Sequence, residues 1–287
     1  MAAMLDHRLN PYRPDIAAES LKGRVEALRY VAGEERRVAR AVIPLKSKPG
    51  GGGPLDNEVL FGERVKVFDE ADGWAWVQLQ RDGYVGYVPA KALSSELHPD
   101  THRVSALGTF VYPVPDIKSA PIMHLTMNAR LAAHGQKERF LELKTGGWVV
   151  ARHVAELGRS ARDFVEIAER FIGTPYLWGG RTRLGLDCSG LLQIALEAAG
   201  RECPRDSDLQ QASLGVDVLV PPDLEGLERG DLVFWPGHVG IMTDGVMMVH
   251  ANAHHMAVAI EPLRDAADRI ARLGSKIAAV KRMSVRA

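Results

Sequence analysis

The sequence predicts an α+β protein in which two small all-β barrels precede a domain that mixes helices and strands. Three observations lead to this prediction. Between residues 38 and 158, short runs of β-branched and aromatic residues alternate with Gly, Asp and Pro turns. An amphipathic helical pattern begins at Ser160. After Gly230, apolar runs separated by turn residues indicate successive strands.

Composition and charge narrow the classes of function. Of the 287 residues, 46% are hydrophobic and 25% charged, as in an ordinary globular domain. Lys plus Arg and Asp plus Glu both number 36, so nucleic acid is not an expected partner. No stretch approaches the roughly 20 apolar residues that span a bilayer, and "MAAMLDHRLNPYRPDIAAES" lacks the apolar core of a signal peptide. We therefore expect a cytoplasmic protein with no membrane partner.

The first half of the chain divides into an extension and the two barrels. Residues 1–37 are charged and weakly patterned, and we expect this extension to pack on the barrels. In residues 38–97, Trp74 and Trp76 alternate as in a strand, and "ADGW" and "RDGY" are turn sequences. Residues 98–158 repeat the pattern more weakly and end in "TGGWVVARHV", which corresponds to "RDGYVGYVPAKAL" in the first barrel.

Residues 159–287 are predicted to form one module with helices before strands. The apolar residues of "SARDFVEIAERFIGTPYLWGG" recur at helical spacing, and Gly173 and Pro175 end this helix. A second amphipathic stripe in "GLDCSGLLQIALEAAG" starts after Cys188 and is closed by Gly200. The segment "DLVFWPGHVGIMTDGVMMVHANAHHMAVAIEPL" indicates strands with a turn at "TDG".

The position of Cys188 at the start of a helix indicates a chemical role for its thiol. A helix N-terminus favours the thiolate, which is the nucleophilic form. His238 and His250 lie on the predicted strands that flank "TDG", so one imidazole can exchange protons with the thiol while the other orients it. A thiolate–imidazolium pair predicts activity that rises above a lowered thiol pKa and falls as His238 loses its proton. Cys203 has no such context, and two cysteines form no disulfide framework.

An ordered set of motifs resembles the NlpC-type family of papain-like cysteine peptidases, which cut peptidoglycan peptides. The motifs are "GTPYLWGG", "GLDCSGLLQ", "RDS", "GDLVFW", "GHVGIM" and "VHA", within roughly residues 160–265. The preceding segments resemble tandem bacterial SH3-like barrels. The resemblance implies a papain-like catalytic domain with Cys188 as nucleophile, His238 as general base and acid, and His250 as the residue that orients His238.

The resemblance also implies a reaction and a substrate. Members with this layout, the γ-D-glutamyl-L-diamino acid endopeptidases, hydrolyse the bond between γ-D-glutamate and meso-diaminopimelate or L-lysine. They favour small muropeptides with a free N-terminal L-alanine, whose ammonium group Asp206 in "PRDSD" is expected to bind. The implied substrate-binding residues are Tyr176, Trp178, Ser189, Asp206, Ser207, Tyr84 and Glu58. The expected role is recycling of cell-wall peptides, without a metal or cofactor.

Several alternatives stay open on sequence alone. Cys188, His238 and His250 could bind zinc with water as the fourth ligand, or the peptidase domain could be an inactive part of a wall-peptide-binding module. Acyl transfer to an amine would use the same residues as hydrolysis. Asp206 could cap a helix, and Tyr84 could pack within its barrel. The oligomeric state is not predicted.

Overall fold

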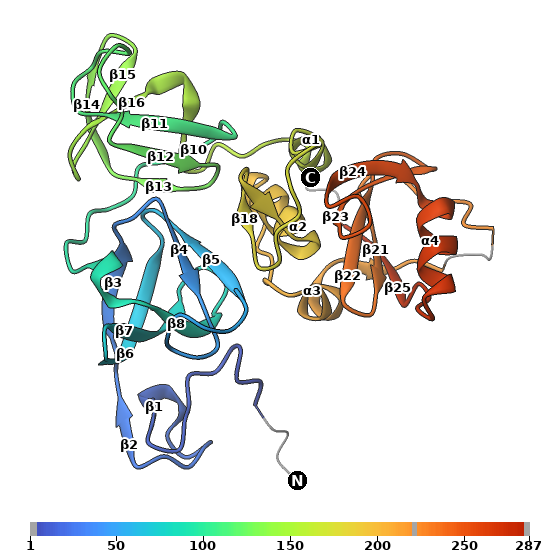
Figure 1. Cartoon of the computed structure of the whole chain (residues 1–287), viewed down its shortest axis with the longest axis horizontal. Helices are drawn as coiled ribbons and strands as arrows, with labels where there is room; N and C mark the ends of the chain where they lie inside the picture. Colours follow the sequence, from blue (N-terminus) through green and yellow to red (C-terminus); the bar gives the residue numbers. More distant parts are fainter. Residues whose placement is uncertain (1–4, 220–222, 284–287) are drawn as a thin grey trace. The chain divides into compact units, whose positions relative to one another are not determined.

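The computed structural model describes residues 5–219 and 223–283. The chain divides into two compact units, residues 1–157 and 158–287 (Figure 1). The first unit consists of strands and short 3-10 turns, whereas the second combines α-helices with a six-stranded sheet. The predicted α+β class is therefore confirmed. Within the described residues, no helix has the length and apolar character needed to cross a membrane.

The N-terminal extension packs on the first barrel. Its elements are β1 (Ile16–Ala18), a 3-10 turn (Glu19–Leu21) and β2 (Arg29–Val31). Ile16 is fully buried in a cluster that includes Phe68 and Trp76 of the barrel. The guanidinium of Arg13 lies 4.5 Å from the centre of the Trp76 ring and donates to Asp69 at 2.6 Å. Apolar burial and this ion pair together fasten the extension to the barrel.

The first barrel is built from a five-stranded sheet in the order β8-β7-β6-β3-β9 and the hairpin β4-β5. Its elements are β3 (Glu34–Val38), β4 (Val42–Leu45), β5 (Asn57–Leu60), β6 (Arg64–Ala71), β7 (Trp74–Leu79), β8 (Val85–Pro89), a 3-10 turn (Ala90–Ala92) and β9 (Leu93–Ser94). The "ADGW" turn joins β6 to β7 as predicted, with Asp72 and Gly73 at positive φ. Val65, Val77 and Tyr84 belong to the buried core.

The second barrel follows directly and shares part of its core with the first. Its elements are β10 (His102–Val104), β11 (Gly108–Tyr112), β12 (Met123–Thr126), β13 (Arg130–Leu131), β14 (Ala133–Lys137), β15 (Phe140–Leu143), β16 (Trp148–Val150), a 3-10 turn (Ala151–His153) and β17 (Val154–Glu156). Phe61 of the first barrel is buried with Val104 and Leu125 of the second. The backbone N–H of Arg130 donates to the Phe61 carbonyl at 2.9 Å. A Cβ on Gly62 would lie 2.1 Å from the Arg130 carbonyl oxygen, so the close approach of the two backbone segments requires glycine at this position.

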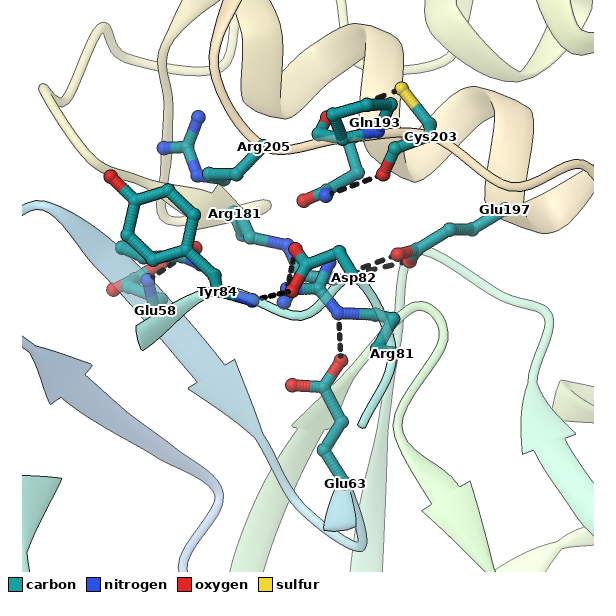
Figure 2. A network of polar contacts seen from close by, with 12 residues as sticks. Glu58, Glu63, Arg81, Asp82, Tyr84, Arg181, Gln193, Glu197, Cys203 and Arg205 are labelled. Carbon is teal, nitrogen blue, oxygen red and sulfur yellow. Dashed lines mark hydrogen bonds and ion pairs between the residues drawn. The ribbon is translucent and has the colours of Figure 1, made fainter. Parts of the chain in front are cut away.

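The second unit has an antiparallel sheet in the order β20-β25-β21-β22-β23-β24. Its elements are α1 (Phe164–Glu169), β18 (Arg181–Thr182), β19 (Gly185–Leu186), α2 (Cys188–Ala198), α3 (Ser207–Ser213), β20 (Val216–Asp217), β21 (Asp231–Trp235), β22 (His238–Met242), β23 (Met247–Asn252), β24 (Ala257–Pro262), α4 (Leu263–Arg272) and β25 (Ala279–Arg282). Helices α2 and α4 lie on opposite sides of β22 and β23 (Figure 1). Arg181 of β18 is buried and donates to Glu197 of α2 at 3.1 Å (Figure 2).

Candidate active site

The N-terminus of α2 is fixed by a tight polar cap. Asp187 occupies the N-cap position, and its carboxylate accepts from the backbone N–H of Gly190 at 2.7 Å and of Gly179 at 2.8 Å. A Cβ on Gly190 would lie 2.3 Å from the Gly180 carbonyl oxygen, so the helix approaches this loop more closely than a larger residue would allow. These contacts hold Cys188 as the first residue of α2, with 8% of its surface exposed.

A buried arginine from a separate segment forms hydrogen bonds with this cap. Both terminal nitrogens of Arg205 donate to Asp187, at 2.9 and 2.6 Å, and one also donates to the Ser189 hydroxyl at 2.8 Å. Only 1% of Arg205 is exposed, so this bidentate pair is shielded from water. Gln193 of α2 donates to the Cys203 carbonyl at 2.9 Å (Figure 2), which ties the segment before Arg205 to the helix.

The thiol of Cys188 faces strand β22. The backbone N–H of Val239, the residue after His238, forms a hydrogen bond to the sulfur. Burial raises the pKa of the Cys188 thiol to about 12, and the charge of Asp187 adds to this effect. The Val239 N–H and the Arg205 charge lower the pKa but are outweighed. This direction is opposite to the lowered thiol pKa expected from the sequence, because desolvation disfavours the thiolate more than the helix N-terminus favours it.

Three polar side chains on neighbouring strands of the same sheet form a hydrogen-bonded row. His238 begins β22, His250 lies on β23 and Glu261 on β24, and alternation along these neighbouring antiparallel strands places all three on one face. His238 Nε2 lies 2.8 Å from His250 Nδ1, and His250 Nε2 lies 2.7 Å from a Glu261 oxygen. Arg269 of α4 donates to both oxygens of Glu261, at 2.7 and 2.6 Å.

The environment of this row favours neutral imidazoles beside an ionised carboxylate. Burial lowers the pKa of His238 from 6.5 to about 3, and the charges of His250 and Arg269 act in the same direction. Burial also lowers the pKa of His250, against the opposing hydrogen bond from Glu261. For Glu261, burial acts to raise the pKa, but hydrogen bonds with Arg269 and His250 outweigh it and hold the pKa well below its usual range.

Four of the predicted substrate-binding residues surround the start of α2 and α3. Tyr176 is partly buried, and burial together with the nearby charges of Cys188 and Asp187 raises its pKa to about 12. The Ser189 hydroxyl is held by Arg205, as described above. The remaining two residues begin α3, where Asp206 takes the N-cap position and Ser207 is the first helical residue.

The other three predicted substrate-binding residues differ in their surroundings. Trp178 is 63% exposed, in the loop before β18. Tyr84 and Glu58 belong to the first unit. Tyr84 is 6% exposed and packs in the core of the first barrel, and Glu58 is partly buried on β5. Their roles toward a substrate stay predictions.

The group of potential metal ligands within the described part of the chain differs from the predicted zinc set. Ligand atoms of His250, His255 and Glu261 all lie within 4.8 Å of one another, and Cys188 is not part of this group. Both oxygens of Glu261 already accept from Arg269. The positive charge of Arg269 opposes binding of a cation between these three residues.

Four residues of this site were not singled out in the sequence. Asp187 and Arg205 lie inside the quoted motifs "GLDCSGLLQ" and "RDS", next to residues that were selected, so their polarity was a usable signal. Glu261 and Arg269 follow the last motif and have no local pattern that marks them. Only the pairing of β23 with β24 and the packing of α4 bring them to His250.

Comparisons with known proteins agree with this architecture. Residues 45–93 match the bacterial dipeptidyl-peptidase Sh3 domain, and residues 173–269 match the NlpC/P60 family. The chain is 25% identical to dipeptidyl-peptidase 6 of Lysinibacillus sphaericus over 232 residues, which cover 72% of this chain and 84% of that protein. It is 28% identical to a gamma-D-glutamyl-L-lysine dipeptidyl-peptidase of Bacillus subtilis over 223 residues, 69% of this chain and 72% of that protein.

A solved structure shows the same fold over most of the chain. An NlpC/P60 family protein from Bacillus cereus superposes with a TM-score of 0.73 at 20% identity, covering 87% of this chain and 99% of that one. The family matches and the relatives thus agree on a peptidase domain after an SH3 domain. The chain is therefore a cysteine peptidase that carries an NlpC/P60 domain at residues 173–269 and a bacterial SH3 domain at residues 45–93.

Proposed function

We propose that the chain hydrolyses the bond between γ-D-glutamate and a diamino acid in small peptidoglycan-derived peptides with a free N-terminal L-alanine. The observation that carries the proposal is the buried Cys188 thiol against the strand that His238 begins, with the His238 ring hydrogen-bonded to His250. Relatives named for γ-D-glutamyl-L-lysine cleavage match 69% and 73% of this chain and support the choice of bond.

In the proposed mechanism His238 exchanges protons through Nδ1, because Nε2 contacts His250. The Cys188 sulfur attacks the γ-carbonyl carbon of D-glutamate as its proton moves to His238. The C–N bond then breaks, and His238 gives the proton to the leaving amine of the diamino acid, which leaves a thioester on Cys188. A water molecule loses a proton to His238 and attacks the thioester, and the proton returns to the sulfur as the new carboxylate leaves.

The first turn of α2 supplies stabilisation for the tetrahedral intermediates. We assign the backbone N–H of Cys188 as a donor to the developing oxyanion, since it lies at the helix N-terminus next to the reacting sulfur. The Tyr176 hydroxyl is the second polar group assigned to the reacting carbonyl, and the contribution of Cys188 to the raised pKa of Tyr176 supports this assignment. The Cys188 N–H is fixed at the start of α2 before substrate binds, which is what such stabilisation requires.

The substrate's free ammonium group is assigned to Asp206. This residue follows Arg205, whose two hydrogen bonds to Asp187 hold the start of α3 close to the start of α2. A carboxylate at that position is complementary to a free N-terminus and rejects an acetylated one. Ser207 and Trp178 are assigned to the same pocket.

Mass spectrometry of the products from a panel of wall peptides tests the proposal. We expect L-Ala-γ-D-Glu-L-Lys or its meso-diaminopimelate counterpart to yield L-Ala-D-Glu and the free diamino acid, and N-acetylated peptides to react poorly. Equal rates for free and acetylated peptides would remove Asp206 from its role. Activity that is lost to chelators but survives thiol alkylation would favour the zinc mechanism. No cleavage of any peptide in the panel would favour the wall-binding alternative.

The cellular role is proposed as recycling of released wall peptides in the cytoplasm. The role follows from the proposed preference for peptides with a free N-terminal alanine, because glycan-linked stems have that amine blocked. Fractionation of cells that express the full chain tests the location. Recovery of the protein outside the cytoplasmic fraction would reject recycling and would leave the proposed chemistry intact.

A further inference from the structure

We propose that Glu261, held by Arg269, is a positioning residue that sets the protonation pattern of both histidines and so leaves His238 Nδ1 free to accept the thiol proton. The inference rests on the proposed function, in which His238 is the general base. It goes beyond that function because Glu261 touches neither the thiol nor the substrate and acts only through His250.

With both imidazoles neutral and Glu261 ionised, the geometry leaves one consistent assignment of protons along the row. An ionised carboxylate only accepts hydrogen bonds, so the 2.7 Å contact of Glu261 with His250 Nε2 requires a proton on that nitrogen. A neutral His250 then has a bare Nδ1, which must accept the 2.8 Å hydrogen bond from His238 Nε2–H. A neutral His238 with its proton on Nε2 has a lone pair on Nδ1. The general base is therefore in the tautomer that can take a proton from Cys188.

Arg269 has a different part in this arrangement. It approaches Glu261 through two nitrogens, at 2.7 and 2.6 Å, so it fixes the plane of the carboxylate and favours its ionised form. The Glu261 side chain is 10% exposed and Arg269 23%, so water competes weakly for the carboxylate. Because the pair is neutral overall, it orients the histidines without adding a full negative charge beside them.

Substitutions of the two partners separate positioning from mere structural support. Glu261→Met removes the acceptor, so His250 is no longer held in one tautomer, and we expect kcat to fall about ten- to a hundredfold with a smaller change in KM. Glu261→Gln keeps one acceptor oxygen and should give an intermediate loss. Arg269→Gln keeps the carboxylate but loses the two contacts that fix its plane, so kcat should fall less than in Glu261→Met.

Arg269→Gln should also shift the acid limb of the kcat/KM profile to higher pH. The charged and titratable groups that act on the two rings are Glu261 of β24, Arg269 of α4 and His255 of the β23–β24 turn. The Cys188 thiol of α2 contacts β22 at the backbone of Val239. Removing the Arg269 cation leaves the Glu261 charge unopposed, which favours protonated histidines. If the ion pair served stability alone, both substitutions would lower thermal stability, and neither would change the kcat of the folded enzyme or move its pH profile.

Asp231→Asn is the matched control. Asp231 is buried and forms an equivalent two-point pair with Arg282, at 2.8 and 2.7 Å, away from the histidines. This variant should lose thermal stability and keep kcat. A loss of kcat equal to that of Glu261→Met would show that any broken ion pair in this sheet impairs the enzyme, and would overturn the proposal.

Nitrogen-15 NMR of the histidine rings tests the assignment without relying on activity or on a variant that folds. In the full-length wild-type chain at neutral pH, we expect protonated Nε2 and bare Nδ1 on both His238 and His250. A proton on His250 Nδ1 would overturn the inference and leave the peptidase function standing. Conversely, an active Cys188→Ala variant would reject the proposed function while leaving the tautomer pattern unchanged.

Discussion

His238 Nε2 lies 2.8 Å from His250 Nδ1, and the two rings belong to neighbouring strands of one sheet. This contact uses one nitrogen of the proposed base and leaves the other for the thiol. It also limits rotation of the His238 ring, because turning it would break a hydrogen bond in a site from which water is largely excluded.

Replacing the proposed nucleophile should abolish turnover. Cys188→Ala is expected to reduce kcat by about a thousandfold or more, since removal of the nucleophile leaves only binding and polar stabilisation. Cys203→Ala is the matched control, because Cys203 is also buried in this unit and contacts Gln193 instead of the histidines. Steady-state assays and mass spectrometry of the thioester would check both. A Cys188→Ala variant that cleaves at the wild-type rate would exclude this nucleophile.

Removing the second histidine should impair chemistry more than binding. His250→Ala leaves His238 Nε2 and a Glu261 oxygen without their shared partner, and we expect kcat to fall by about a hundred- to ten-thousandfold. His255→Ala serves as the control, because its ring lies 3.9 Å from Glu261 and is partly exposed. A change confined to KM in His250→Ala would contradict an orienting role.

The pH dependence of thiol alkylation should report a protonated resting site. Burial raises the pKa of Cys188 to about 12 and lowers that of His238 to about 3, so the unliganded enzyme holds a thiol and a neutral imidazole at pH 7. Iodoacetamide should therefore react slowly at neutral pH, with a rate that keeps rising above pH 9. Fast alkylation at pH 5 to 6 would instead support the thiolate–imidazolium pair expected from the sequence.

The second unit should lose stability in mild acid. Between about pH 3 and 6.5 the folded protein leaves His238 neutral, whereas the unfolded chain binds a proton there. The free energy of unfolding therefore falls as pH drops below 6.5, by up to about 1.4 kcal/mol per pH unit for a single histidine. Thermal unfolding of wild type and His238→Gln from pH 7.5 to 5 would measure this. Equal slopes for the two proteins would contradict the lowered pKa.

The two-point ion pair between Arg205 and Asp187 should contribute to stability through its geometry as well as its charge. Arg205→Lys cannot reproduce both hydrogen bonds, and we expect a loss of about 2 to 4 kcal/mol in unfolding free energy. Arg229→Lys is the control. Arg229 binds Glu169 through two nitrogens at 2.9 and 3.0 Å, but 39% of its side chain is exposed, so the loss should stay below about 1 kcal/mol. Similar losses in chemical denaturation would show that burial of the Arg205 ion pair adds nothing.

The fold was predictable where periodicity and turn residues are local. The β6–β7 turn at Asp72 and Gly73 and the start of α2 at Cys188 both follow from short sequence signals. The beginning of the first barrel was harder to predict. Strand β3 starts at Glu34, before the predicted boundary at residue 38. The strand "EERRV" carries four charged residues, so it lacks the apolar alternation that marks a strand.

The candidate site was predictable only in part, for a physical reason. Sequence motifs mark Cys188, His238 and His250. The parts of Glu261 and Arg269 in the site can be recognised only from strand register and helix packing, which bring them to His250. The pKa of the Cys188 thiol could not be predicted from the sequence either. A helix N-terminus is visible as a pattern, but the burial that outweighs it depends on how closely β22 covers the sulfur.

Burial of Phe61 in the core of the second barrel is expected to couple the folding of the two barrels. Because this ring completes the apolar interior of the other barrel, a protein cut between residues 97 and 98 would expose an aromatic surface on one fragment and an unfilled hollow on the other. Proteolysis or truncation there should release partly folded, aggregation-prone fragments instead of two intact domains. Evolutionary shuffling of this region would accordingly have to exchange the pair of barrels together.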